Sequence, residues 1–187
     1  FLPHRFEDPF GNPTIVAYDA APDGRKYNLL VTAVVDPIGN QITAAHDYRS
    51  LQPRLIIDPN RNHSEVVFDT LGMVAGTAVK GKVDDAGRSE SGDALAGFVS
   101  DLNDELQAFM AAPHAEAGAL LGNATTRIVY DLDRYWNAGQ PVFAATIARE
   151  KHVSDVAGGV SSVQVSFSYS DGFGREIQQK IQAEAGP

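Results

Sequence analysis

The amino-acid sequence predicts a mainly β protein, an antiparallel meander of hairpins in a curved open sheet with a helical insertion. A phrase that begins with Asp-Pro occurs three times, and runs rich in β-branched residues surround it. One long segment has helical periodicity instead. The recurring phrase decides the architecture, because each copy of a repeat forms one supersecondary unit.

The three copies are DPFGNPTIVAYD (8–19), DPIGNQITAAHD (36–47) and DPNRNHSEVVFD (58–69). All three have Asp-Pro at the start, Asn at the fifth position, an aromatic residue or His at the eleventh and Asp at the twelfth. Apolar runs such as LLVTAVV (29–35) and RLII (54–57) precede the turns. Each copy therefore predicts one hairpin, and successive copies predict a meander.

The residues at the turns have identifiable roles. Proline presets φ for a β-turn, and an Asp carboxylate accepts a backbone N–H two residues further on. Gly11 and Gly39 tolerate the positive φ that a short hairpin loop requires. In the third copy Arg61 stands at the glycine position, so we expect Asn60 or Asn62 to take the left-handed conformation there.

More distant copies follow in RIVYDLDRY (127–135) and VSFSYSDGFGREIQQKI (165–181). FDTLGMV (68–74) and YSDGFGREI (169–177) share the pattern aromatic-Asp-x-x-Gly-x-apolar, the second with Ser170 inserted. The structural positions that the repeats single out are Asp8, Pro9, Gly11, Asn12, Tyr18, Asp19, Asp36, Pro37, Gly39, Asn40, Asp58, Pro59, Asn62, Asp69, Tyr169, Asp171, Gly172 and Gly174.

The segment between the repeats differs in character. We expect one structural unit with β-hairpins over 1–79, a loop and helical insertion over 80–123, and further strands over 124–187. A polar, Gly- and Ser-rich stretch from Lys80 precedes a predicted helix over 93–111, with Ser91 or Asp93 as N-cap. Pro113 opens a second short helix that ends at Gly122-Asn123. We expect the apolar stripe of the first helix to pack on the sheet, with partner binding as the alternative: Leu95, Phe98, Val99, Leu102, Leu106, Phe109 and Met110.

Bulk composition excludes several classes of function. The net charge is −9 and no Lys/Arg cluster exists, which argues against nucleic-acid binding. No run of 18 apolar residues occurs, so we expect no direct membrane insertion. The absence of cysteine excludes disulfides and thiolate chemistry. Because the chain opens without Met in a strand-like phrase, we expect it to be a piece of a longer protein.

Metal and catalytic alternatives fit the sequence poorly. The third copy places Asp58, Asn60, Asn62, Ser64 and Asp69 at the ligand positions of an EF-hand loop, but His63 replaces the required glycine and predicted strands flank it. The five histidines are widely separated, and the carboxylate pairs are predicted to be solvated: Asp84-Asp85, Asp101/Asp104 and Asp131/Asp133. We therefore expect no enzyme activity, no catalytic residue, no cofactor and no metal.

Trp136 with Tyr135 and Tyr130 offers one further alternative, a platform on which a sugar ring could stack. Aromatic packing at a sheet edge explains the same residues. This leaves an extracellular carbohydrate- or surface-binding β module as the second function class, and a hydrolase built on carboxylates as the third.

The repeat phrases, together with LQPRLIIDPN (51–60) and SYSDGFGREIQ (168–178), resemble YD-repeat (Rhs) proteins. More closely, they resemble the B component of bacterial insecticidal toxin complexes, a family related to Salmonella virulence plasmid B proteins. The resemblance extends over nearly the whole chain, helical insertion included. Arg61 in place of glycine, His46 in place of tyrosine and the inserted Ser170 depart from the repeat pattern.

The resemblance implies a structural role. In this family YD-repeat hairpins continue one another into a hollow shell, which encloses the toxic C-terminal part of the C component until delivery. The implied partners are that C component, neighbouring repeats of the same chain and, through other segments, the channel-forming A component. The implied location is that of a secreted or cell-surface bacterial toxin component. Stacking also agrees with physics, since an isolated hairpin is marginal in water.

Overall fold

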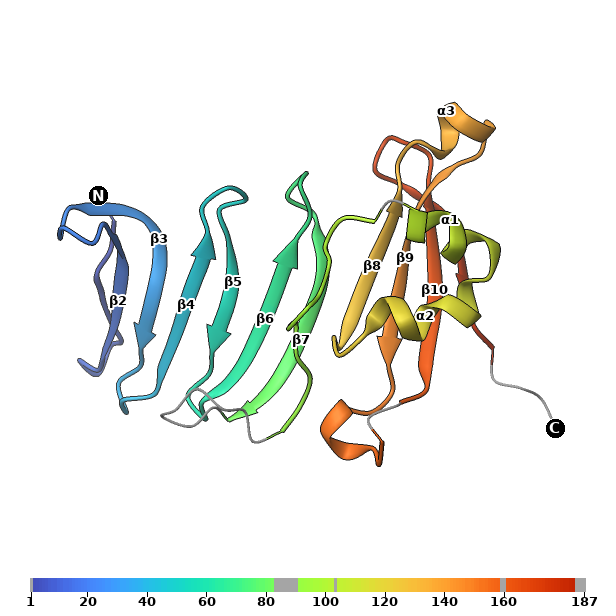
Figure 1. Cartoon of the computed structure of the whole chain (residues 1–187). Coiled ribbons are helices and arrows are strands. Elements are labelled where there is room, and N and C mark those ends of the chain that lie inside the picture. Colours follow the sequence, from blue (N-terminus) through green and yellow to red (C-terminus); the bar gives the residue numbers. More distant parts are fainter. Residues whose placement is uncertain (1, 83–90, 103, 159–160, 184–187) are drawn as a thin grey trace. The chain divides into compact units, whose positions relative to one another are not determined.

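The computed structural model describes residues 2–82, 91–102, 104–158 and 161–183. Its strands follow one another in sequence order through an eleven-stranded antiparallel sheet that does not close on itself (Figure 1). The predicted mainly β fold, an open antiparallel meander, is therefore confirmed. The chain divides into two compact units, Phe1–Val66 with Val79–Glu90, and Val67–Ala78 with Ser91–Pro187.

In the first unit, the Asp-Pro stretches connect consecutive strands. Residues 8–12 join β1 to β2, residues 36–40 join β3 to β4, and residues 58–62 lead from β5 into β6. Apolar β-branched side chains favour the extended strands between these turns. The strands are β1 (Arg5–Glu7), β2 (Pro13–Ala20), β3 (Lys26–Val35), β4 (Gln41–Asp47), β5 (Gln52–Ile57) and β6 (Asn62–Phe68), the last of which crosses the boundary between the units.

The second unit combines strands with short helices. β8 pairs with β9 and β9 with β10 over six and eight residue pairs, respectively. The elements that complete the chain are β7 (Val74–Lys82), α1 (Asp104–Ala111), α2 (Pro113–Leu121), β8 (Thr126–Asp131), α3 (Arg134–Ala138), β9 (Val142–Arg149), a 3-10 turn (Val153–Asp155), β10 (Val163–Ser170) and β11 (Glu176–Ile181). No helix in the described part of the chain combines the length and apolarity needed to cross a bilayer.

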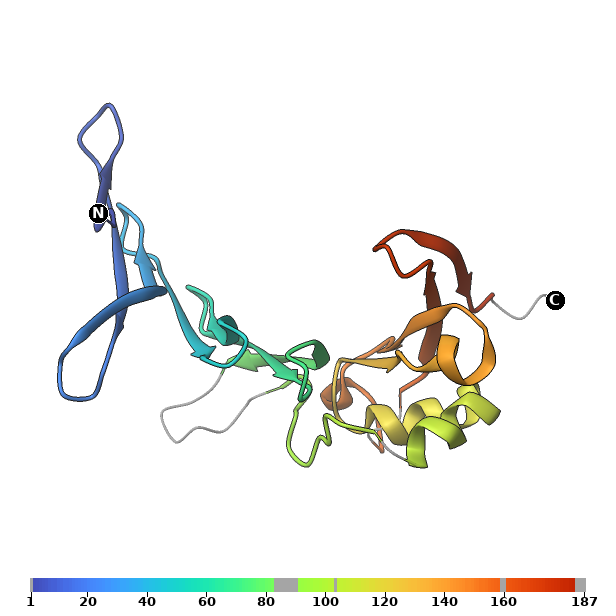
Figure 2. The ribbon, with the colours of Figure 1, turned by 90° about the horizontal axis from the view of Figure 1, so that it is seen from above.

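The hydrophobic core lies where α1 and α2 cover one face of β8, β9 and β10 (Figure 2). Phe109 of α1 is fully buried and stacks on Phe167 of β10, with 6.0 Å between the ring centroids. Alternate residues of β9 face this core, as the two-residue period of a strand requires. The buried cluster consists of Phe109, Ala117, Leu121, Ala124, Val129, Phe143, Ala145, Ile147 and Val165.

The helix predicted over 93–111 is wrong in its first half. α1 begins at Asp104, and the described residues from 93 to 102 form turns and irregular backbone, with Gly97 at a φ of 74°. Neither Ser91 nor Asp93 is an N-cap, because no helix begins beside them; the Asp93 carboxylate makes tertiary contacts instead. The polar excursion also begins later than predicted, since β7 continues to Lys82. The second helix is confirmed, with Pro113 in its first turn and its C-cap at Gly122.

Six residues of the predicted stripe are nevertheless packed, and Leu106, Phe109 and Met110 of this set lie on α1. Leu95, Phe98 and Leu102 pack on the core cluster from irregular backbone. The Phe98 ring lies so close to Gly76 that a Cβ at that glycine would be 2.3 Å from Phe98 Cζ. Val99, in contrast, is 61% exposed and is no part of the packed set. Periodicity therefore identified buried residues but not the backbone that carries them.

Candidate functional site

The repeat turns have a common hydrogen-bonded frame. In the first copy, Asp8 Oδ1 accepts the backbone N–H groups of Phe10 (2.8 Å) and Asn12 (2.9 Å). The side-chain amide of Asn12 donates to Asp8 Oδ2 at 2.8 Å. The Asp8 N–H donates to the Asn12 carbonyl at 3.1 Å, and the Gly11 N–H donates to the Asp8 carbonyl at 3.0 Å. One carboxylate thus closes a five-residue turn.

The second and third copies reproduce this frame. Asp36 Oδ1 accepts the N–H groups of Ile38 and Asn40, and Asp36 Oδ2 accepts the Asn40 amide at 2.8 Å. Asp58 accepts the Asn62 N–H at 2.8 Å and the Asn62 amide at 2.9 Å. The Asn at the fifth position therefore closes the turn by donating its side-chain amide to the Asp at the first position. The sequence pattern alone did not assign this role. Pro9, Pro37 and Pro59 occupy the second position of the turns.

The fourth turn position requires positive φ in every copy. Gly11 has a φ of 83° and Gly39 a φ of 89°, and in both cases the space around the missing Cβ is open. The expectation for the third copy is wrong: Arg61 itself takes the left-handed conformation at a φ of 69°, and neither Asn60 nor Asn62 does so. Asn62 keeps its hydrogen bonds to Asp58, so the hydrogen-bonded turn places the positive φ at the fourth position whichever residue occurs there.

Two further turns share this geometry outside the three Asp-Pro copies. Asp69 donates its N–H to the Met73 carbonyl at 2.9 Å, accepts the Met73 N–H at 2.8 Å, and is followed by Gly72 at a φ of 83°. Asp171 accepts the N–H of Phe173 at 2.8 Å, and Arg175 Nε replaces the asparagine amide at 2.7 Å. Gly172 and Gly174 both have positive φ there.

Hydrogen bonding keeps the turn carboxylates charged. The side-chain amide of Asn12 is the largest cause that lowers the pKa of Asp8 from 3.8, and the Asn62 amide does the same for Asp58. For Asp36, burial raises the pKa, but the bonds from Asn40 and the backbone outweigh it and the net pKa is lowered. Donors aimed at a carboxylate favour its ionised form. The turns therefore present a fixed negative charge at neutral pH.

The aromatic-Asp pair at the end of the first copy connects different parts of the unit. Asp19 is buried, and its Oδ1 accepts the N–H groups of Leu29 (2.7 Å) and Leu30 (2.9 Å) beside a residue with positive φ, Asn28. Tyr18 donates its hydroxyl to the Pro3 carbonyl at 3.0 Å. Burial raises the pKa of Asp19, yet these hydrogen bonds and one from Tyr48 lower it overall.

The corresponding aromatic positions elsewhere have diverged. Tyr169 packs in an aromatic group with Phe143 and Phe167 instead of closing a turn. Tyr130 donates its hydroxyl to the Val74 carbonyl at 3.0 Å, which joins β8 to β7. Burial raises the pKa of Tyr130, and the nearby Asp69 carboxylate adds to the effect. The aromatic residue of the repeat therefore makes a different contact in each copy: a hydrogen bond to a neighbouring backbone carbonyl at Tyr18 and Tyr130, and ring packing at Tyr169.

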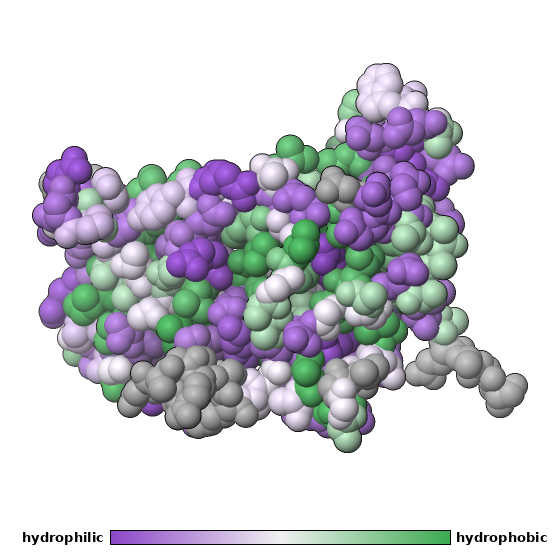
Figure 3. Space-filling view, viewed as in Figure 1, coloured by the Kyte–Doolittle hydropathy of each residue, from purple (hydrophilic) through white to green (hydrophobic). Residues whose placement is uncertain are grey.

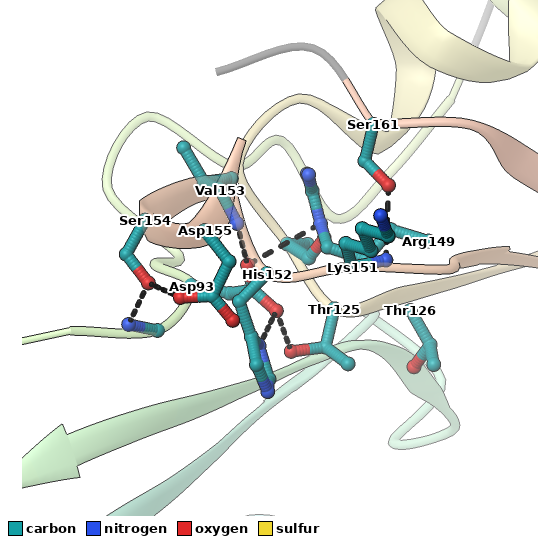
Figure 4. Close-up of polar contacts among 12 residues, drawn as sticks. Asp93, Thr125, Thr126, Arg149, Lys151, His152, Val153, Ser154, Asp155 and Ser161 are labelled. Carbon is teal, nitrogen blue, oxygen red and sulfur yellow. Dashed lines mark hydrogen bonds and ion pairs between the residues drawn. The ribbon is translucent and has the colours of Figure 1, made fainter. Parts of the chain in front are cut away.

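A buried carboxylate forms the densest polar cluster of the second unit (Figure 4). The Asp93 side chain is inaccessible to solvent, and it accepts the Thr125 hydroxyl at 2.6 Å and the Val153 N–H at 2.8 Å. Arg149 Nε lies 3.4 Å from Asp93 Oδ1, and His152 Nδ1 lies 2.8 Å from Oδ2. Burial raises the pKa of Asp93, but these contacts outweigh it and lower the pKa overall.

The Asp93 cluster holds irregular backbone in place. Arg149 also donates to the carbonyls of Ala124 and Gly122, both at 2.6 Å. Through these bonds Asp93 and Arg149 connect the start of β8, the end of β9 and the 3-10 turn. Sequence reasoning missed the cluster, because its members are dispersed along the chain and no local motif marks them.

Two of the three carboxylate pairs lie among the described residues, and in each pair one aspartate contacts another residue's polar groups. Asp101 accepts the Thr70 N–H and hydroxyl at 3.0 Å each, while Asp131 pairs with Arg134 at 3.5 Å. Asp84-Asp85 lies outside the described residues. Among the residues that the structure describes, no group of three or more His, Asp or Glu side chains could hold a metal ion. The geometry also disfavours the calcium alternative, because β6 (Asn62–Phe68) runs through residues 58–69 and pairs with β5, so these residues do not form a loop between two helices.

The aromatic residues of α3 are more exposed than sheet-edge packing predicts. Trp136 is 83% exposed and contacts Tyr135 edge to face, with 5.7 Å between the ring centroids. Tyr130, the third member of the predicted platform, is instead tied to Val74. Any platform on this helix therefore consists of two rings at an angle of 75°.

The comparisons with known proteins were made on sequence and on structure. No family model and no curated protein matches the sequence. The fold is similar to the crystal structure of TcdB2-TccC3, with a TM-score of 0.68 and 20% identity over 94% of this chain. It is also similar to TcdB2-TccC3 without its hypervariable C-terminal region (TM-score 0.65, 17% identity, 94% of this chain) and to the Tc holotoxin pore of Photorhabdus luminescens (TM-score 0.64, 16% identity, 94% of this chain).

This chain spans only 8–10% of the length of those chains. At such identities the likeness establishes the fold, a run of hairpins that occurs within a much longer protein chain.

Proposed function

We propose that this chain is a non-enzymatic wall segment in the YD-repeat shell of an insecticidal toxin-complex B component. In this role the sheet helps to enclose the toxic C-terminal part of a partner C subunit until delivery. The observation that carries the proposal is the five-residue Asp turn, which recurs between antiparallel strands arranged in sequence order. A meander of this kind extends by adding hairpins at either end, as the wall of a large container requires.

Three other features support this function. The resemblance of the repeat phrases to the B component covers nearly the whole chain, and the fold similarity to TcdB2-TccC3 covers 94% of it. Within the described residues, β1 and β11 each pair on one side only, so each leaves an edge on which a further hairpin can pair. The Asp93 carboxylate and the aspartates of the repeat turns accept backbone N–H groups, which suits a structural role in a wall.

The proposed location follows from the same role. A component that meets its partners as an assembled toxin acts as a secreted or cell-surface protein of a bacterium. Its partners are then the C component, adjoining repeats and, through other segments, the channel-forming A component. The net charge of −9 argues against nucleic acid as a partner.

Protease protection tests the proposal. The longer parent protein is co-expressed with its C partner, and the complex is exposed to a non-specific protease. We expect the C-terminal part of the partner to survive in the complex and to be degraded in the partner alone. Equal rates of degradation in both samples contradict the enclosing role.

Carbohydrate binding is the second candidate, favoured by the exposure of Trp136 and Tyr135 on α3. An exposed indole ring offers a flat face for a sugar. The discriminating measurement is saturable glycan binding by this chain on an array, compared with a Trp136→Ala variant. Binding that disappears in the variant favours this candidate, and absence of binding to any glycan supports the wall segment.

A further inference from the structure

The ladder between β7 and β8 is short (Figure 1). In the described part of the chain two residue pairs join these strands, Gly76 with Arg127 and Thr77 with Thr126, whereas β8 pairs with β9 over six residues. The stretch Ile128–Asp131 therefore has a paired strand on the β9 side alone among the described residues. Alternate residues of a strand direct their backbone groups to opposite sides, so an unpaired edge is a template for another strand.

A side chain replaces the ladder beyond Gly76. The register of the two pairs, if it continued, would place Val74 opposite Val129. The Val74 carbonyl instead accepts the hydroxyl of Tyr130 at 3.0 Å. The two strands are thus held together at this point without further ladder pairs, and the β7 side of Ile128–Asp131 stays open to a different strand.

A cavity of about 510 Å³ lies beside this edge, where the ladder ends. All four residues of Ile128–Asp131 line it, together with residues of the turn before β7 and the first residues of α3. Leu102, Leu106 and Met110 supply apolar surface. Ligand sites have volumes of roughly 300–1,000 Å³, and four residues of extended chain span about 13 Å. The cavity therefore combines an open strand edge with an apolar wall.

The lining of the cavity is negatively charged. It contains four aspartates and one arginine, a net charge of −3. Arg134 pairs with Asp131 at 3.5 Å, whereas neither Asp69 nor Asp133 makes an ion pair within the part of the chain that the structure describes. The hydrogen bond that Asp69 accepts comes from a neutral group, the Met73 N–H. Hydrophilic residues also gather around α3 on the surface (Figure 3). Such a lining favours a cationic ligand and repels an anionic one.

We propose that this cavity binds an extended basic peptide of a partner protein, which adds to the sheet as a strand along Ile128–Asp131. The backbone of the peptide forms ladder hydrogen bonds with β8, and its apolar side chains contact Leu106 and Met110. Its Lys or Arg side chains meet the carboxylates of Asp69 and Asp133. Strand addition of this kind takes affinity from main-chain bonds and specificity from side-chain pockets. The site is separate from the edges of β1 and β11, and it does not depend on what the sheet encloses.

Fluorescence anisotropy of labelled peptides on the whole 187-residue chain tests the proposal. The probe is a six-residue peptide of alternating Lys and Val, and we expect saturable binding. Replacing each Lys by Glu should weaken binding about tenfold or more. Methylating the backbone nitrogens of the Lys–Val peptide should cause a loss of similar size, because the ladder donors are removed. Absence of binding by the Lys–Val peptide overturns the proposal, as does equal binding by either altered peptide.

Variants of the chain test the two carboxylates. Asp69→Asn combined with Asp133→Asn should weaken binding of the Lys–Val peptide about tenfold or more. Asparagine at position 69 keeps an oxygen that can accept the Met73 N–H, so the turn is retained. Asp104→Asn is the matched control, since it removes an exposed charge of α1 outside the cavity and should leave binding unchanged. Circular dichroism checks the fold of each variant. Equal losses in the control and the double variant contradict a site in this cavity.

Amide hydrogen exchange locates the bound peptide. Main-chain pairing protects amides from exchange, so Ile128–Asp131 should exchange more slowly in the presence of the Lys–Val peptide. The edges of β1 and β11 should exchange at the same rate with and without it. Protection that increases at β1 or β11 and not at Ile128–Asp131 overturns the proposal, because the peptide then pairs at an end of the sheet.

Discussion

The hydroxyl of Tyr48 donates a 2.7 Å hydrogen bond to the carboxylate of Asp19, a residue 29 positions earlier in the chain. Asp19 ends the first repeat and Tyr48 follows the second, so the bond joins two successive repeats. The same carboxylate holds the N–H groups of Leu29 and Leu30. The bond to the carboxylate raises the pKa of Tyr48, because the phenol must stay protonated to donate it. Successive hairpins are therefore tied by side chains as well as by the sheet.

Removing this tie should destabilise the first unit. Tyr48→Phe loses the single hydroxyl donor, and we expect a lower melting temperature by circular dichroism. Asp19→Ala should lower it further, because two backbone N–H groups also lose their acceptor. Tyr27→Phe is the matched control, since the Tyr27 hydroxyl has no hydrogen-bond partner among the described residues. An equal effect of Tyr27→Phe and Tyr48→Phe would refute the tie.

The left-handed turn position gives a pair of opposite predictions. Gly39→Val should lower the free energy of unfolding by about 1 kcal/mol or more, because a β-branched side chain resists a φ of 89°. Arg61→Gly should raise the free energy of unfolding by up to about 1 kcal/mol, because it relieves the strain of a non-glycine residue at a φ of 69°. Urea unfolding of both variants checks the signs. Two changes of the same sign contradict the account of the turn.

The core of the second unit should depend on the buried Phe109 of α1 and not on the exposed Val99 of the segment before it. Phe109→Ala should lower the free energy of unfolding by about 3–5 kcal/mol, because the ring is fully buried against Phe167. Val99→Ala should change it by no more than about 0.5 kcal/mol, because that side chain is exposed. Thermal and urea unfolding of the two variants measure the difference. A large effect at Val99 would restore the amphipathic helix that the sequence predicted over 93–111.

Acid should destabilise the turns. The pKa values of Asp8, Asp36 and Asp58 in the folded protein lie below their ordinary value of 3.8. The stability that these carboxylates contribute is therefore complete above pH 3.8 and is lost as the pH falls through the lower folded pKa values. Urea unfolding at a series of pH values should show this fall, and Asp36→Asn should make the fall smaller. Stability that increases on acidification has the wrong sign for these turns.

The repeat predicted the fold because the contacts that form each turn are between residues close together in the sequence. Asp8, Pro9, Gly11 and Asn12 specify a turn through contacts within five residues, so the sequence alone is sufficient to place the hairpin. The strand order then follows from consecutive hairpins. The same locality explains the error at Arg61, where the frame imposes positive φ on whichever residue occupies the fourth position.

The features that the sequence did not predict depend on contacts between residues far apart in the chain. The Asp93 carboxylate meets Thr125, Arg149 and His152 only after folding, so no spacing in the sequence announces them. Leu95 and Phe98 match a helical period, yet the backbone there is irregular. The tertiary contacts of Asp93 and the packing of the Phe98 ring on Gly76 override the local helical propensity. An apolar hollow likewise combines Tyr27 of β3 with Tyr48, which follows β4.

The most direct test of the wall segment repeats the protease challenge with a lesion inside this chain. Asp93→Ala in the longer parent removes the partner of a buried Arg149, which should destabilise the second unit by about 3–5 kcal/mol. Hydrogen exchange confirms that the lesion is confined to this segment. The account predicts faster cleavage of the enclosed C-terminal part of the partner in the Asp93→Ala complex than in the unaltered complex. Unchanged protection, with the segment opened, would contradict the claim that this chain is part of the enclosing wall.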